Sequence, residues 1–146
     1  MKKETIKWSD FGINPNSLVS IQDIEQVEKY LYITFPDLYK DLLLFAKEAS
    51  PALGVFTYGD VYETSISDFF DCSTKNEPYS IVWYKLHGAS FGLPKTFIPI
   101  ARDAGGYLIC FDYTSFPPKV KLYDPDQQLT YFIAENFEKF VELWHE

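Results

Sequence analysis

Residues 97 to 113, FIPIARDAGGYLICFDY, constrain the fold of this chain more than any other stretch. Two apolar runs rich in β-branched and aromatic residues flank a short turn-forming segment, a pattern typical of two strands joined by a turn. Gly105 and Gly106 can adopt positive φ, as a tight connection between antiparallel strands requires, and Asp103 can accept backbone N–H bonds there. Phosphate-binding loops need another glycine spacing and a helix after it, so we predict a hairpin. Its expected core residues are Ile98, Ile100, Leu108 and Cys110.

The segments around this hairpin predict a helical first half and a mostly stranded second half. Helical apolar spacing indicates helices over residues 20–32, from Pro36 to about Ala49, and from Asn76 to Gly88. One or two strands are expected over residues 54–62, and residues 65–72 (SISDFFDC) are expected to form one helical turn. Further strands are predicted over 96–101, 107–113, 119–123 and 128–133, before a closing helix capped by Asn136.

This order of elements predicts an α+β fold with a single domain. We expect an antiparallel β-sheet meander packed against N-terminal helices and a C-terminal helix. Residues 1–20 are expected to form an irregular arm, and residues 21–146 the domain itself.

The composition excludes several classes of protein. The chain has 146 residues and a formal net charge of −8, which disfavours direct binding to nucleic acid because the phosphate backbone is negative. The longest apolar run, LLLFA at residues 42–46, is far shorter than the roughly 20 residues of a membrane span. The first residues lack the apolar core of a signal peptide, so a cytoplasmic location is expected. Cys72 and Cys110 are expected to be buried free thiols.

Three segments, taken in order, resemble the SUKH superfamily, which comprises yeast cell-wall assembly regulators and many bacterial immunity proteins. They are IEQVEKYLYITFPDLYKDLLLF, FIPIARDAGGYLICFD and ENFEKFVELW. The residues that match the family pattern are Phe35, Pro36, Tyr39, Pro99, Asp103, Gly105, Gly106, Asp112, Asn136, Phe137 and Phe140. Two positions differ from that pattern: Tyr107 stands where the family often has an acidic or amide residue, and Asn136 where serine is usual.

The resemblance implies a binding module. Bacterial members neutralise a toxin encoded by an adjacent gene, commonly a nuclease-type domain, through protein contact. We therefore expect an immunity protein whose partner is such a cognate toxin. The alternative is a regulatory scaffold similar to the fungal relatives.

The residues offer little for catalysis, and we expect no enzyme activity, no metal and no cofactor. His145 is the penultimate residue, and His87 falls in the last turn of a predicted helix, where a cation interacts favourably with the helix dipole. Asp124 and Asp126 lie close together in DPDQQ, a pattern typical of a turn, and the following residues lack the ligands of a calcium loop.

The strongest candidate for partner binding is the acidic, aromatic stretch over residues 54–78. Five acidic residues stand there against Lys75, so the stretch holds four net negative charges, and five aromatic residues are interleaved. Such a surface suits a basic partner. The candidate toxin-binding residues are Tyr58, Asp60, Tyr62, Glu63, Asp68 and Asp71. The alternative is that the aromatic residues belong to the core and the acidic residues to an ordinary solvated face.

Overall fold

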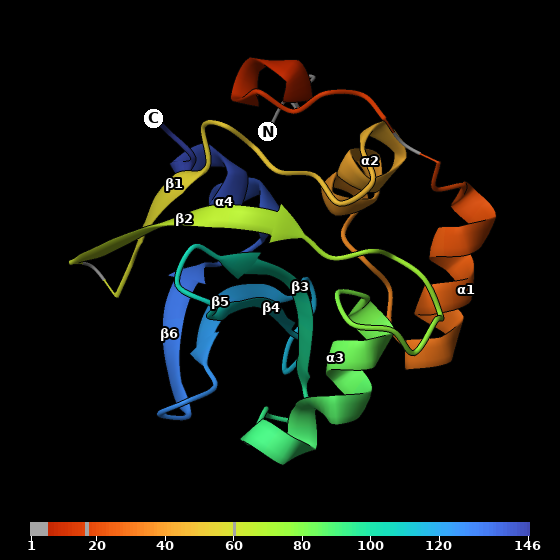
Figure 1. Cartoon of the computed structure of the whole chain (residues 1–146), viewed down its shortest axis with the longest axis vertical. Helices are drawn as coiled ribbons and strands as arrows, with labels where there is room; N and C mark the ends of the chain where they lie inside the picture. The colour runs from red at the N-terminus through yellow and green to blue at the C-terminus, as the bar shows by residue number, and fades with distance from the viewer. Residues whose placement is uncertain (1–5, 17, 60) are drawn as a thin grey trace.

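A computed structural model describes residues 6–16, 18–59 and 61–146 and has the predicted α+β architecture (Figure 1). The six strands pair antiparallel in chain order. They are β1 Val55–Tyr58, β2 Tyr62–Phe69, β3 Phe97–Asp103, β4 Leu108–Asp112, β5 Lys119–Asp124 and β6 Leu129–Ala134. The helices are α1 Ile21–Leu31, α2 Asp37–Phe45, α3 Ile81–His87 and α4 Phe137–Leu143. No helix in the described ranges is both long and apolar enough to cross a membrane.

The sheet curls strongly, so that its first strand returns towards its last. The Gly59 N–H donates to the Phe132 carbonyl at 3.4 Å, which joins the end of β1 to β6. At the other end of β1, Val55 and His145 exchange two backbone hydrogen bonds of 3.0 Å. Both contacts satisfy backbone groups that an open edge strand would expose.

Local capping explains where the helices begin. The Ser20 hydroxyl accepts from the Asp23 N–H at 3.1 Å and the Asp23 carboxylate accepts from the Ser20 N–H at 2.9 Å, which is a capping box. The Asn136 side chain accepts from the Lys139 N–H at 2.8 Å and confirms the predicted cap of α4. The Asn136 that replaces the usual serine therefore keeps the capping function.

An aromatic core joins α2, the sheet and α4. The Tyr39 ring on α2 packs edge to face against Phe111 of β4 at 5.1 Å and against Phe137 of α4 at 5.5 Å. Phe35 completes this group at 5.0 Å from Tyr39, and all four side chains are buried. The matching residues Phe35, Tyr39 and Phe137 are thus structural.

The predicted hairpin is confirmed as β3 and β4. Ile98, Ile100, Leu108 and Cys110 are all buried. Of the two glycines only Gly106 has a positive φ, at 88°, whereas Gly105 has an ordinary backbone conformation. The Asp103 carboxylate closes the turn, because its Oδ1 accepts from the N–H groups of Gly105 and Tyr107 at 2.9 and 2.8 Å.

Buried aspartates end three successive strands. Asp103, Asp112 and Asp124 are the last residues of β3, β4 and β5, and each accepts a backbone N–H from the turn that follows it. Asp124 Oδ1 accepts from Asp126 and Gln127 at 2.9 and 3.2 Å, as expected for a turn. Each aspartate therefore holds the backbone of the turn that follows its strand.

One predicted element is wrong, and two predicted helices differ from the structure in one of their bounds. Residues 65–72 do not form a helical turn, because β2 continues to Phe69 and pairs with β1 on one side and β3 on the other. The third helix begins at Ile81, capped by Ser80 rather than Asn76, since the preceding residues turn back to form a backbone bridge between Asp71 and Ser80. The second helix ends at Phe45, before the predicted Ala49.

The N-terminal arm packs on the domain. Trp8–Phe11 form a short 3₁₀ helix, and the Trp8 indole N–H donates to Asp41 on α2 at 2.9 Å. The Trp8 ring lies 6.2 Å from Trp144, so the arm contacts both α2 and the segment that follows α4.

Candidate protein-binding surfaces

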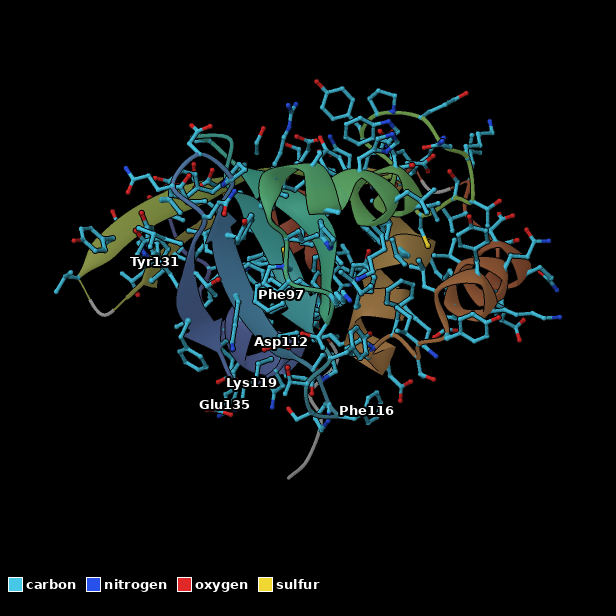
Figure 2. All side chains as sticks on the ribbon, turned by 90° about the horizontal axis from the view of Figure 1, so that it is seen from below. Phe97, Asp112, Phe116, Lys119, Tyr131 and Glu135 are labelled. Atoms are coloured by element: carbon cyan, nitrogen blue, oxygen red, sulfur yellow. The ribbon has the colours of Figure 1, made fainter. Side chains whose placement is uncertain are left out.

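Three tyrosines form a cluster where the β1–β2 hairpin meets β6. Tyr58 lies 5.5 Å from Tyr62 and 5.2 Å from Tyr131, and Tyr62 lies 6.3 Å from Tyr131. Figure 2 shows Tyr131 beside this hairpin. We call Tyr58, Tyr62 and Tyr131 the tyrosine cluster. It is accessible, because Tyr62 is 55% exposed and the adjacent Val61 is 77% exposed.

Two buried carboxylates, those of Asp103 and Asp124, act on the tyrosine cluster. Burial raises the pKa of Tyr58, and the charges of Asp103 and Asp124 add to this shift. A hydrogen bond to Asp124 raises the pKa of the neighbouring Tyr107. Glu63 points to the opposite face of the hairpin from Tyr62, and its carboxylate, 59% exposed, lies 3.6 Å from the His145 imidazole. The cluster therefore combines aromatic surface with negative potential.

Asp68 and Asp71 of the predicted site do not join this cluster. Asp60 lies outside the described residues. The Asp68 carboxylate accepts from Arg102 at 2.6 Å, and the Asp71 carboxylate lies 3.9 Å from the Lys47 ammonium. Asp68 is six residues along β2 from Tyr62, roughly 20 Å at the usual strand rise. The acidic, aromatic stretch over residues 54–78 therefore does not form one surface, because its tyrosines lie at the start of β2 and Asp68 and Asp71 lie at or beyond its end.

Sequence reasoning missed Tyr131, which comes from a strand far along the chain. The signal that could have found it is the alternation of LTYFIA, residues 129–134. Tyr131 pairs with Leu122 of β5, which is buried, so the two side chains lie on the same, core-facing side of the sheet. Tyr131 lies near the start of β6, where this side of the sheet is no longer fully covered.

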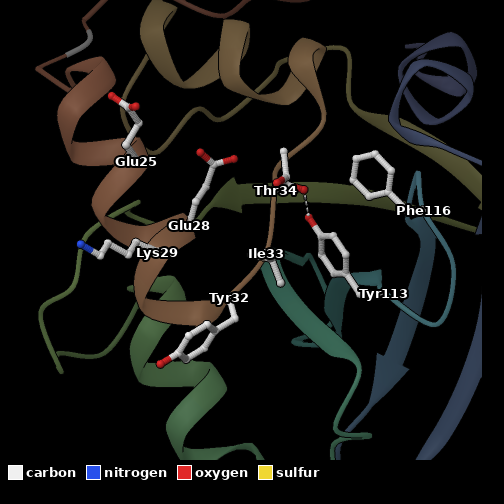
Figure 3. A pocket seen from close by; sticks show the side chains of 8 residues that line it. All are labelled: Glu25, Glu28, Lys29, Tyr32, Ile33, Thr34, Tyr113 and Phe116. Atoms are coloured by element: carbon white, nitrogen blue, oxygen red, sulfur yellow. Dashed lines mark hydrogen bonds between the residues drawn. The ribbon is translucent and has the colours of Figure 1, made fainter.

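A second surface is an open groove of about 810 Å³ beside α1 (Figure 3). We call it the α1 groove. Its lining residues come from α1, the segment after it and the β4–β5 connection, and they are Glu25, Glu28, Lys29, Tyr32, Ile33, Thr34, Tyr113 and Phe116.

Polar contacts hold the floor of the α1 groove in place. Glu28 Oε2 accepts from the Phe35 N–H at 2.6 Å and lies 3.7 Å from the Lys40 ammonium. The Tyr113 hydroxyl donates to the Thr34 carbonyl at 2.8 Å. Burial, together with the nearby Glu28 charge, raises the pKa of Tyr113, so this hydroxyl stays protonated and remains a donor.

The histidine and cysteine side chains make packing contacts within the fold. The His87 ring stacks on Trp83 at 4.4 Å, and its Nδ1 lies 2.9 Å from the Trp83 carbonyl. Both cysteines are free and buried, as predicted, and burial raises the pKa of Cys72 to about 12. Among the described residues, no group of three or more His, Cys, Asp or Glu side chains is placed to hold a metal ion.

Comparisons with known proteins agree with this architecture. A solved structure, described as the crystal structure of a protein from Pseudomonas syringae pv. tomato, superimposes with a TM-score of 0.50 at 19% identity. The similarity covers 76% of this chain and 71% of the other, and it shows a shared fold. None of the curated proteins searched matches the sequence. The model of the SMI1 / KNR4 family (SUKH-1) matches residues 18–143. The chain therefore belongs to the SMI1 / KNR4 family (SUKH-1).

Proposed function

We propose that this protein is an immunity protein that binds a cognate toxin and neutralises it by protein contact, without catalysis. The toxin is a basic domain, of nuclease type, encoded by an adjacent gene, and the encounter takes place in the cytoplasm. Family membership supports a binding module of this kind.

The observation that carries the proposal is the accessible tyrosine cluster at the end of the β1–β2 hairpin. Tyrosines supply large contact area at low conformational cost and are enriched among the residues that dominate binding energy. The net charge of −8 steers a basic partner towards the molecule. The contact surface proposed here therefore comprises Tyr58, Tyr62 and Tyr131, together with Glu63 on the other face of the same hairpin. It leaves out Asp68, which is paired with Arg102.

Two variants test this surface. Tyr62→Ala removes an exposed aromatic ring, and Glu63→Lys reverses a charge that is 59% exposed. We expect each to weaken toxin binding, measured by calorimetry, by about tenfold or more, with little change in melting temperature. Glu142→Lys on α4 is the matched control, since Glu142 is 58% exposed and the charge change is the same.

Co-expression tests the function itself. Cells that produce the toxin domain should survive only when this protein is present. If they die equally in both cases, the immunity proposal is wrong, and the regulatory scaffold becomes the better description. If the protein protects and both variants bind normally, the function stands and the tyrosine cluster is not the contact.

A further inference from the structure

We propose that the end of the β1–β2 hairpin enters the substrate-binding cleft of the toxin and excludes nucleic acid from it. This inference rests on the proposed function and adds the mode of inhibition, which is competition with the substrate. The side chains that make the contact are Val61, Tyr62 and Glu63, which we call the hairpin tip.

The hairpin tip projects beyond the neighbouring strand. β2 pairs with β3 only from Ile66 onward, and the last backbone bond at this end joins the Ala104 N–H to the Ser65 carbonyl at 2.9 Å. Residues 62–64 therefore extend past β3 by roughly 10 Å at the usual strand rise. Figures 1 and 2 both show this end of the hairpin reaching outward past β3. A projecting part buries more of its surface in a concave partner than against a flat one.

Both faces of the hairpin tip are accessible. Tyr62 and Glu63 are consecutive residues of β2, so their side chains point to opposite faces of the hairpin. Tyr62 is 55% exposed, the Glu63 side chain is 59% exposed, and Val61 in the turn before them is 77% exposed. A flat partner can contact only one face of such a ribbon, whereas the walls of a cleft contact both faces and the end. The partner surface that fits all three side chains is therefore a cleft.

The segments that meet at this end of the molecule contain no lysine or arginine. They are residues 55–66, 103–107 and 122–131, joined through the Thr64–Asp103 hydrogen bond and the contact of Tyr58 with Tyr131. Their acidic residues are Asp60, Glu63, Asp103, Asp124 and Asp126. Glu63 and Asp126 are exposed, and the His145 imidazole beside Glu63 is charged only when protonated. Because a nuclease binds the phosphate backbone with basic groups, its substrate cleft is the concave surface whose charge complements this end.

The hairpin tip is held in place before any partner binds. The Thr64 hydroxyl donates to the Asp103 carboxylate at 3.0 Å, and the Gly59 N–H donates to the Phe132 carbonyl at 3.4 Å. These bonds tie both strands of the hairpin to the rest of the sheet close to its turn. Little conformational freedom is therefore lost when the hairpin tip enters a cleft.

Competition for the cleft tests the proposal. The toxin domain from the adjacent gene is bound to a fluorescent phosphorothioate oligonucleotide, in RNA and DNA forms, and anisotropy is recorded while the whole protein is added. The protein should displace the oligonucleotide completely, and its apparent affinity should weaken about tenfold when the oligonucleotide is present at ten times its own Kd. A ternary complex, in which anisotropy rises, would overturn the proposal and leave toxin neutralisation intact. A toxin domain that binds neither oligonucleotide would remove the nuclease class and this inference with it, whereas failure to protect cells in co-expression would remove the proposed function.

Variants locate the contact. Val61→Ser removes the most exposed apolar side chain of the hairpin tip and should weaken displacement of the oligonucleotide by about tenfold. Ile21→Ser is the matched control and should leave displacement unchanged. Ile21 is also β-branched, is 57% exposed and begins α1, which Figure 1 shows on the opposite side of the molecule from the hairpin.

A fluorophore at the hairpin tip reports insertion directly. Val61→Cys can be labelled selectively, because the thiols of Cys72 and Cys110 are buried. The label should be quenched by iodide in the free protein and shielded from iodide in the complex with the toxin domain. A label that is equally accessible to iodide in both would overturn the proposal, even if the toxin is neutralised.

Discussion

The buried aspartate at the end of β4 shows how much a single residue contributes here. Asp112 accepts from the Thr96 hydroxyl at 3.0 Å and from the Thr114 N–H at 3.0 Å, and its other oxygen lies 2.8 Å from the Lys121 ammonium. Burial by itself would raise the pKa of Asp112. The hydrogen bonds from Lys121 and the two threonines outweigh burial and lower the pKa to about 2.

A substitution at this position has a predictable pH signature. The folded pKa of Asp112 lies below its ordinary value of 3.8, so its contribution to stability is present above pH 4 and is lost as the pH falls towards 2. Asp112→Asn should lower the free energy of unfolding by about 2 kcal/mol at pH 7, because Lys121 loses its carboxylate partner. It should also reduce the pH dependence between 2 and 4. Urea denaturation at several pH values measures both, and exposed Asp126→Asn is the control. An unchanged pH dependence would contradict this account.

Single residues also explain why the β3–β4 hairpin could be predicted. Its turn depends on neighbours in sequence, since Asp103 bonds to the amides of Gly105 and Tyr107. The cap of α4 by Asn136 is equally local and was predicted as well.

At the scale of elements, α1 ends on a conformation that its sequence does not favour. Tyr32 occupies the position where helices commonly place glycine, and its N–H and that of Ile33 cap the helix by donating to carbonyls of the last turn. A structural requirement alone would favour glycine over tyrosine at this position.

Tyr32→Gly should therefore stabilise the fold. Relief of the left-handed strain is expected to raise the free energy of unfolding by about 1 kcal/mol, with thermal melting as the measurement. Tyr30→Gly is the contrasting control, because Tyr30 is exposed but lies inside α1, where glycine should destabilise the helix. A fall in melting temperature for Tyr32→Gly would refute the strain argument.

Elements whose partners are distant in the chain were harder to predict. Residues 65–69 were expected to be helical, yet they form part of β2 because residues 101–103 of β3 pair with it, more than thirty positions later. The α1 groove was not predicted for the same reason, since Tyr113 and Phe116 meet α1 only through the fold. The structure brings together only part of the predicted candidate site: Tyr58 and Tyr62 are in contact, whereas Glu63, Asp68 and Asp71 have partners elsewhere.

At the scale of the whole molecule, the net charge of −8 shapes the kinetics of association. If the partner is basic, long-range attraction accelerates encounter and is screened by salt over about 10 Å at 0.1 M. Contacts of the tyrosine cluster act at short range and are little affected by salt.

The two contributions should separate in a kinetic experiment. Between 50 and 500 mM NaCl, the association rate of the toxin domain should fall by about tenfold or more while the dissociation rate changes little. Tyr62→Ala should do the reverse, raising the dissociation rate at every salt concentration. Surface plasmon resonance resolves both rates. An association rate that is independent of salt would count against a basic partner.

The aspartates that end β3, β4 and β5 have a consequence for how such a protein can diversify. The turns over 104–107 and 125–128 leave the sheet at the end that carries the tyrosine cluster, and the connection over 113–118 supplies Tyr113 and Phe116 to the α1 groove. Because each aspartate holds the backbone of the connection that follows it, the exposed side chains of that connection can change in chemistry while the strand register is kept. The sheet thus serves as a constant frame with exchangeable loops, and new partner specificity can arise by replacing a loop while the core stays the same.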